Sequence, residues 1–384
     1  MSRLTFAVVA LLAPVVLTVP GHALPRMTLT TGAPCANCHV DPQGSGLRTD
    51  LGWYAMNQTG AWTWKQIGWD SLHNLEDNTL LDGKVSLGLD YRGQMARLGR
   101  PTRGTDGKVK FPDRQVIPMQ LTPEVAIMPT DTVTVTGSMN ASAFIKSYPG
   151  QSPWQAWARW QPSPTAPYVR AGMMQPSVGI RHDDHTMLLR SDAASPRQPM
   201  IPPDYADPGA EIGWAPSHWL LVQVGTLLAR NLTEAVPTVA KDEPGASGRL
   251  ALFPQWLEAG LNGMAGASYL RAGDLQFTSG YVGVGKNYWG TLLFEASHAK
   301  RSAKHSTLNM MLHATVPVKD WLTVEARAER ATSELGSQTA ETRALVAGLQ
   351  FEPVPFVELR PEYHYLVTDD YTLGQYTLQL HLFF

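Results

Sequence analysis

Cysteine is nearly absent from this sequence, which contains only two among its 384 residues. A structural zinc site would need two further Cys or His ligands at close spacing, and no such pair lies near them. A thioredoxin-like redox pair would need a βαβ context, which is also missing. The scarcity of cysteine therefore disfavours both of these sites and directs attention to the spacing of the two residues themselves.

Three further features are lacking. The formal net charge is -2, so the chain has no basic surface for nucleic acid. After the N-terminus, no stretch approaches the ~20 uninterrupted apolar residues that a membrane-spanning helix requires. The sequence also has no Gly-rich nucleotide fingerprint and no convincing catalytic triad. The lack of a basic surface excludes a nucleic-acid partner, and the sequence shows no separate catalytic site.

The two cysteines lie in the motif Cys35-Ala36-Asn37-Cys38-His39. This is the Cys-x-x-Cys-His spacing of a covalent c-type haem, in which two thiols add to the two vinyl groups of one porphyrin. The adjacent histidine is then placed to ligate the iron from the proximal side. The motif predicts one haem c, held by Cys35 and Cys38 with His39 as the iron ligand.

The N-terminus predicts export. Arg3 precedes an apolar region from Leu4 to Val19, and Gly21-His22-Ala23 offers a small-x-small cleavage site. Residues 1–23 are therefore predicted to be a signal peptide, followed by a monohaem cytochrome c domain over residues 24–82. That domain is short and cannot build a large core without the porphyrin.

From about Gly83 to the C-terminus, alternation of apolar and polar residues recurs in segments of about ten, separated by turn residues. This pattern predicts an all-β transmembrane antiparallel barrel of about sixteen strands over residues 83–384. The predicted strands include Val85–Met95, Thr132–Phe144, Trp219–Leu227, Tyr288–Ser297, Trp321–Arg327 and Phe356–Leu366. A soluble β-sandwich is the alternative for strands of this kind.

The connections support the barrel because they alternate in length. If the first strand starts on the periplasmic side, every second connection should be a short periplasmic turn. The short connections are Pro129–Asp131, Ala215–Ser217, Phe253–Gln255, Lys286–Asn287, Val318–Asp320 and Glu352–Pro355, with Gln161–Pro167 a looser member. Most of the intervening connections are long and polar, although those around Pro149 and Gly273 are short.

The last strand has the clearest alternation. Tyr376, Leu378, Leu380, Leu382 and Phe384 share one face, and Thr377, Gln379 and His381 share the other. A chain that ends on an aromatic residue after such a strand resembles the C-terminal assembly signal of bacterial outer-membrane barrels.

Together, the signal peptide, the segment Thr31–His39 and the barrel up to the terminal aromatic strand resemble the fused monohaem cytochrome-porins of the bacterial outer membrane. The resemblance implies oxidation of extracellular Fe(II) and transfer of the electron to a periplasmic c-type cytochrome or another soluble carrier. The protein would then be an electron-transfer haem protein that acts as an Fe(II) oxidase. Because one tunnelling step cannot efficiently cross an apolar band ~25 Å tall, the haem is expected inside the lumen or on the periplasmic side of the barrel.

The motif does not specify the sixth haem ligand. Met56 is the first candidate, because a thioether would raise the reduction potential, followed by His73 and Met27. Five aromatic residues follow the motif closely: Trp53, Tyr54, Trp62, Trp64 and Trp69. They either pack on the porphyrin or anchor the chain at the lipid headgroups.

A second metal site is predicted at His182, Asp183, Asp184 and His185, since imidazole and carboxylate can ligate divalent ions. A solvated or salt-bridged loop is the simpler explanation. The loop that contains them, Pro176–Pro208, could also fold into the barrel as a constriction.

Two other functions remain open. The chain could be a solute-diffusion porin with a tethered haem plug or sensor domain. It could also be a soluble periplasmic redox enzyme, which would be extractable without detergent.

Overall fold

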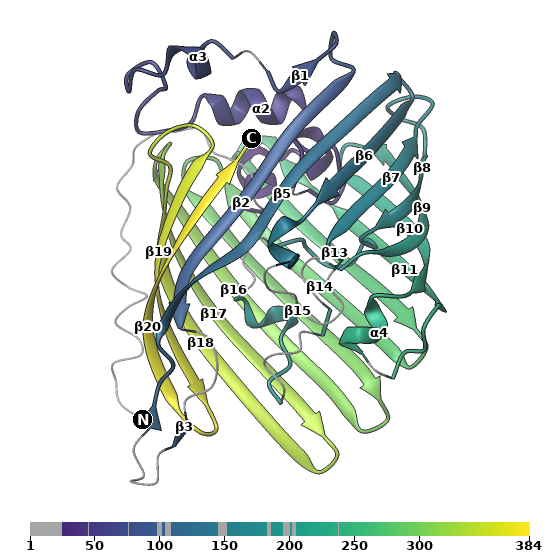
Figure 1. Cartoon of the computed structure of the whole chain (residues 1–384), viewed down its shortest axis with the longest axis vertical. Coiled ribbons are helices and arrows are strands. Elements are labelled where there is room, and N and C mark those ends of the chain that lie inside the picture. The colour runs from purple at the N-terminus through teal and green to yellow at the C-terminus, as the bar shows by residue number, and fades with distance from the viewer. Residues whose placement is uncertain are drawn as a thin grey trace.

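The computed structural model describes residues 25–44, 46–75, 77–97, 102–103, 109–144, 152–182, 186–194, 200–201, 205–236 and 238–384. The predicted signal peptide, residues 1–23, lies outside the described residues. Sixteen long antiparallel strands close into a single barrel, with a few short helices at one end (Figure 1). None of the described helices is long and apolar enough to span a membrane.

The strands of the barrel are β2 (Val85–Arg97), β5 (Arg114–Thr130), β6 (Val133–Met139), β7 (Trp154–Trp160), β8 (Tyr168–Met174), β9 (Asp207–Ser217), β10 (Leu220–Ala229), β11 (Glu243–Leu252), β13 (Leu261–Ala272), β14 (Leu275–Lys286), β15 (Gly290–Ser302), β16 (His305–Lys319), β17 (Leu322–Leu335), β18 (Gln338–Phe351), β19 (Val357–Thr368) and β20 (Thr372–Phe383). The minor strands are β1 (Thr79–Leu80), β3 (Thr102–Arg103), β4 (Val109–Lys110) and β12 (Gln255–Trp256). Each barrel strand pairs with its neighbour along the chain, and β2 pairs with both β5 and β20. This last pairing closes the barrel, and it excludes the β-sandwich.

The helices are α1 (Pro25–Thr31), α2 (Asp50–Asn57), α3 (Asp70–His73) and α4 (Leu232–Ala235), with 3₁₀ turns η1 (Cys35–Asn37), η2 (Ala141–Phe144), η3 (Leu188–Arg190) and η4 (Leu257–Ala259). The first three helices and η1 belong to the described part of residues 25–75, which we call the plug. The predicted boundary between residues 82 and 83 falls in the turn between β1 and β2.

Strand alternation separates a lumen face from an outer face. In β20 the side chains of Thr377, Gln379 and His381 are buried, whereas Tyr376 and Leu378 are exposed on the outside, as the sequence predicts. Each strand of the closed sheet forms backbone hydrogen bonds with a neighbouring strand on both sides. An apolar outer face can therefore contact lipid without exposing unpaired backbone groups. The barrel therefore has the surface that an outer-membrane protein requires.

Short turns occur at both ends of the barrel: β15 and β16, and likewise β17 and β18, are joined by two residues each, where the sequence predicted the longer connections Arg301–Ser306 and Ser333–Thr342. The connections predicted to be short periplasmic turns lie at the other end, together with the C-terminus and the plug (Figure 1). Four exposed tryptophans lie on or beside these turns, namely Trp160, Trp219, Trp256 and Trp289. Tryptophan is enriched at membrane–water interfaces, so they form an aromatic girdle at this end.

The predicted C-terminal end of one strand is wrong. The segment predicted as Thr132–Phe144 is a strand only to Met139, and η2 follows. The cause is Asn140, whose Oδ1 accepts hydrogen bonds from the backbone N–H groups of Leu121 and Ser142. The Asn140 side chain thus accepts the backbone hydrogen bond that a continued β6 would have accepted from β5, and the chain turns away from the sheet.

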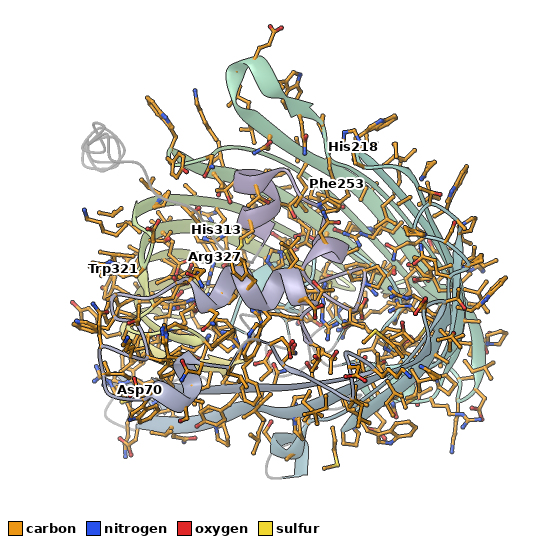
Figure 2. All side chains as sticks on the ribbon, turned by 90° about the horizontal axis from the view of Figure 1, so that it is seen from above. Asp70, His218, Phe253, His313, Trp321 and Arg327 are labelled. Carbon is orange, nitrogen blue, oxygen red and sulfur yellow. The ribbon has the colours of Figure 1, made fainter. Side chains whose placement is uncertain are left out.

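Two segments lie inside the barrel. The plug crosses the opening at the short-turn end, as Figure 2 shows from above. The second is the described part of residues 175–206, which we call the inward segment. The Asn309 side chain donates hydrogen bonds to the carbonyl oxygens of Leu188, Leu189 and Ser191 in that segment. The described part of the connection Pro176–Pro208 therefore lies inside the barrel, which is one of the alternatives that the sequence left open.

Candidate functional site

The two cysteines and His39 lie at the inner face of the plug. Cys35 begins the 3₁₀ turn η1, and its carbonyl oxygen accepts hydrogen bonds from the backbone N–H groups of Cys38 and His39, at 3.1 and 3.0 Å. This tight turn brings both thiols to the same side as the imidazole. All three side chains line one cavity, and neither cysteine is in a disulfide.

The His39 ring is held in one orientation by a backbone carbonyl group a few residues along the chain. The ring is buried, and its Nδ1 lies 3.3 Å from the carbonyl oxygen of Gly46. Donation from Nδ1 to a carbonyl is the usual arrangement of a metal-ligating histidine, because it leaves the Nε2 lone pair for the metal. Burial, with a smaller contribution from the nearby Arg48 guanidinium, lowers the pKa of His39 to about 3, so the ring is neutral at pH 7.

The cavity has a volume of about 1040 Å³, which includes space open to solvent. Its lining comes from both parts of the molecule. The plug supplies the motif with Met27, Met56 and Arg48, and the barrel wall supplies Asp90, Arg92, Arg249, Met264, His381 and Phe383. Two thiols, a neutral imidazole, thioethers and cationic side chains are a donor set that fits a c-type haem.

The three candidates for the sixth ligand are placed differently. Met56 and Met27 are both buried and both line the cavity. His73 lies at the end of the short helix α3, is exposed and does not line the cavity. The sequence analysis missed Met264, a buried residue of β13 that also lines the cavity. No sequence signal could have identified it, because it lies far from the motif along the chain.

The aromatic cluster after the motif fastens the plug to the barrel. Trp53 is buried, and its ring stacks on Phe356 with 4.3 Å between centroids. Trp53 and Trp64 share an apolar cluster with Phe356 and Phe383 at the end of the barrel. The other three aromatic residues, Tyr54, Trp62 and Trp69, are exposed. None of the five lines the cavity itself. Trp53 and Trp64 nevertheless support its wall, because their cluster also contains Met27, Met56 and Phe383.

Polar contacts also fix the plug in the lumen. The Asp41 carboxylate lies 3.2 Å from Nη1 of the fully buried Arg170 and 3.6 Å from Nη1 of Arg181. Burial alone would raise the pKa of Asp41, but these two guanidinium groups hold it below its ordinary value. On another wall, the Asn262 side chain donates hydrogen bonds to the carbonyl oxygens of Leu29 and Thr30 at the end of α1.

The predicted loop metal site is only partly visible. His182 is described, and its Nε2 lies 2.7 Å from Oε2 of Glu295 in β15. Asp183, Asp184 and His185 lie outside the described residues. Among the residues that the structure describes, no group of three or more His, Cys, Asp or Glu side chains could hold a metal ion. The one described member of the motif is therefore an anchor between the inward segment and the wall.

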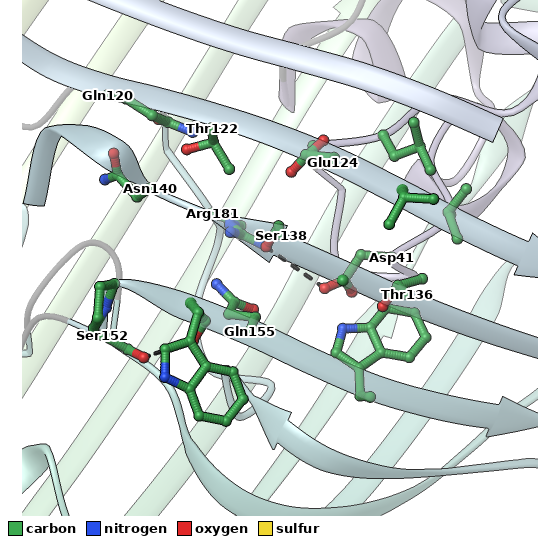
Figure 3. A pocket seen from close by; sticks show the side chains of 18 residues that line it. Asp41, Gln120, Thr122, Glu124, Thr136, Ser138, Asn140, Ser152, Gln155 and Arg181 are labelled. Carbon is green, nitrogen blue, oxygen red and sulfur yellow. Dashed lines mark hydrogen bonds and ion pairs between the residues drawn. The ribbon is translucent and has the colours of Figure 1, made fainter.

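A second, polar cavity of about 660 Å³ lies beside the first (Figure 3). Its walls are the plug residues Val40, Asp41, Gly46 and Leu47 and residues of β5, β6 and β7, including Thr122 and Glu124. Gly46 and Arg181 line both cavities, so these two residues separate them.

No protein-family model matches this sequence, and no curated protein matches it either. Solved structures do resemble its fold. The loop-deleted form of OmpT from Vibrio cholerae has a TM-score of 0.52 at 9% identity, covering 78% of this chain and 99% of that one. OprB of Pseudomonas putida at high pH has a TM-score of 0.52 at 10% identity, covering 85% and 99%. The outer-membrane channel DcaP of Acinetobacter baumannii has a TM-score of 0.52 at 10% identity, covering 78% and 97%. These likenesses show that the chain has a porin-like β-barrel fold.

Proposed function

We propose that this chain is an outer-membrane electron-transfer protein with one c-type haem attached through Cys35 and Cys38 and ligated by His39. The observation that carries the proposal is the common cavity: both thiols and the oriented imidazole of His39 face the same space of about 1040 Å³. The haem would supply one-electron chemistry there. Its expected electron donor is extracellular Fe(II), and its expected acceptor is a periplasmic c-type cytochrome or another soluble carrier.

The residues of this chain would contribute in three ways. The η1 turn holds the two thiols side by side, which allows two thioether links to one porphyrin. The Gly46 carbonyl fixes the tautomer of His39, so that Nε2 faces the cavity. The closed barrel keeps lipid away from this site, and the plug lies at the end where the short turns are expected to face the periplasm.

The barrel also gives the proposed direction of electron transfer a physical basis. The polar cavity adjoins the haem cavity at Arg181 and Gly46, on the side where the plug meets β5 to β7. A donor in the lumen could approach through such a polar space without entering the lipid. The oxidised product would then stay outside the periplasm. No separate catalytic site is part of this proposal, so the Fe(II) oxidase activity would be electron transfer alone.

The test uses oxidised outer membranes that contain the full-length protein, made with the c-type haem maturation machinery. Fe(II) is added without oxygen, and the visible absorption spectrum is recorded. We expect the bands of reduced haem to appear with the wild-type protein and to be absent from a Cys35→Ser/Cys38→Ser control. That control should still insert as a heat-modifiable barrel. Reduction by dithionite but not by Fe(II) would reject Fe(II) as the donor, and no covalent haem in the wild type would reject the whole proposal.

A second candidate is a solute-diffusion porin with a tethered haem plug or sensor domain. The porin-like fold favours it, and one similar structure, from Comamonas acidovorans, is described as an anion-selective porin. A high solute permeability, together with a haem indifferent to external reductants, would support this candidate.

A further inference from the structure

Two buried arginines at the proposed haem cavity form no direct ion pair with any carboxylate in the described part of the chain. Arg48 comes from the plug and Arg249 from β11, and their exposed fractions are 7% and 5%. Among the described residues, neither forms an ion pair. Other lining charges are matched: Asp90 lies 3.0 Å from Nη2 of Arg92 and 3.1 Å from Nε2 of His381. Arg181 lies near Asp41, as described above.

The direct contacts of Arg48 and Arg249 are with neutral groups, although the carboxylates of Asp90 and Glu124 also attract Arg48 from beyond ion-pair distance. The Arg249 guanidinium donates to Oε1 of Gln223 at 3.2 Å and to the hydroxyl of Tyr281 at 3.4 Å. The Arg48 guanidinium lies over the ring of Phe383, 4.5 Å from its centroid. The Nε atoms of both arginines are buried and have no hydrogen-bond partner. A buried charge without a directly paired counter-ion is costly, so two such groups around one cavity favour an anionic ligand in the cavity.

The number and type of these groups match one feature of a haem. A c-type haem uses its two vinyl groups for the thioethers and retains two propionate carboxylates. Guanidinium groups recognise carboxylates with charge-assisted hydrogen bonds. Two unmatched guanidinium groups around the cavity that contains both thiols would therefore meet two carboxylates.

We propose that Arg48 and Arg249 form the subsite for the two haem propionates, so that the haem site is shared between the plug and the barrel wall. The inference rests on the proposed function and deepens it. It makes Arg249, a residue of the barrel, a positioning residue for the haem. The isolated plug would then lack half of the counter-charge that the haem requires.

The experiment uses full-length protein purified from outer membranes, with Arg249→Gln and Arg48→Gln as test variants. Arg271→Gln is the matched control, because Arg271 lies on the neighbouring strand β13 with its side chain exposed. Haem attachment is measured by pyridine haemochromogen, the reduction potential by spectroelectrochemical titration, and propionate hydrogen bonding by the propionate bending bands in resonance Raman spectra.

Loss of either positive charge favours the more positive oxidised haem, so we expect each test variant to lower the equilibrium constant for reduction about tenfold. For a one-electron couple this is a fall of about 59 mV. The propionate bands should shift in both variants and stay unchanged in Arg271→Gln. Arg249→Lys keeps the charge but not the planar donor pair, so it should shift the bands while largely preserving the potential.

The outcomes separate this inference from the proposed function. Attached haem with unchanged potential and unchanged bands in both test variants would overturn the subsite and leave the function standing. If neither glutamine variant inserts as a barrel, unchanged propionate bands in Arg249→Lys would overturn the proposed propionate subsite instead. No covalent haem in the wild-type protein would overturn the function, and the two arginines would then be candidates for an anionic solute.

Discussion

At the scale of single residues, the haem motif depends on close neighbours that have no side chain. A Cβ on Gly52, within α2, would lie 2.2 Å from the carbonyl oxygen of Cys38. Gly44, with a φ of +85°, sits against Cys35, where a Cβ would lie 3.2 Å from the Cβ of that cysteine. The backbone of the plug therefore packs directly on the motif, which leaves no room for larger residues.

This packing gives the first prediction. Gly52→Ala should push α2 away from Cys38 and destabilise the plug by about 1–3 kcal/mol, the usual cost of overpacking. The yield of covalent haem should fall, while the barrel should still insert. Leu51→Ala is the control, because Leu51 is exposed on the same helix. Haem stain on gels and hydrogen exchange of the plug would measure the two effects. A normal haem yield in Gly52→Ala would contradict this account of the packing.

A second prediction at this scale concerns the sixth ligand. Met56 is buried in α2 and lines the cavity that contains His39, so we expect its thioether to ligate the haem iron. Met56→Ala should abolish the far-red absorption band of methionine ligation and lower the reduction potential, since a thioether raises it. Met27→Ala and Met264→Ala serve as controls, because both residues line the same cavity. Loss of the band in either control, with the band intact in Met56→Ala, would assign the ligand to that residue instead.

At the scale of elements, side chains from more than one strand of the barrel fix the plug, and side chains of the wall also hold the inward segment. Asp41 links the plug to Arg170 of β8, and Asn262 of β13 holds the end of α1. Leu29 of α1 also belongs to a buried cluster with residues of the inward segment and the wall. An element with anchors on two walls is expected to stay docked rather than to move as a tethered domain.

The Asp41 anchor should make docking depend on pH. Its pKa lies below the ordinary value of about 3.9. The ion pair therefore stabilises docking fully above that pH, and the stabilisation is lost as the pH falls through the lowered pKa. Asp41→Asn should remove this pH dependence and cost about 1–3 kcal/mol at neutral pH, because Arg170 retains Glu211 as a partner.

Hydrogen exchange of residues 36–44, corrected for the intrinsic rate at each pH, would measure this effect. Exposed Asp70, at the rim in Figure 2, supplies the control variant Asp70→Asn. Equal exchange of the wild type at pH 7 and pH 2, after correction, would show that Asp41 does not hold the plug.

At the scale of the whole molecule, the barrel is large enough for an open channel but contains two docked segments. Barrels of sixteen to eighteen strands usually enclose an aqueous channel. Here one buried apolar cluster joins the plug, the inward segment and the wall. A second cluster packs the inward segment and α4 against the wall. Apolar packing of this kind inside the lumen disfavours free diffusion of solutes.

We therefore expect the full-length protein to have a low single-channel conductance in planar bilayers, well below that of an open porin of equal strand number. Asn309→Ala should raise it, because it removes the three hydrogen bonds that hold Leu188, Leu189 and Ser191. Met310→Ala is the control, since Met310 lies on the same strand with its side chain exposed on the outside. A wild-type conductance as large as that of open porins would favour the solute-channel function.

Much of the architecture could be predicted without the structure. The alternation of Thr377, Gln379 and His381 with apolar residues predicts the lumen face of β20, because side chains of a strand point alternately to its two faces. Short turns such as Glu352–Pro355, between β18 and β19, predict which connections lie together. The end of β6 could not be predicted, since it depends on Asn140 accepting hydrogen bonds from Leu121 on a separate strand.

The sequence by itself determined the Cys-x-x-Cys-His motif and the two faces of each strand, and it predicted a barrel of about sixteen strands, because spacing and period-two alternation are local properties of the chain. Closure of the barrel was decided by the pairing of β2 with β20 in the tertiary structure. Only the tertiary structure decided what surrounds the motif. Arg249, Met264 and His381 reach the same cavity as Cys35 through strand register and barrel closure, which join residues far apart in the chain. Alternation predicts that a side chain faces the lumen, but only the docked plug and the strand register determine which residues it contacts there.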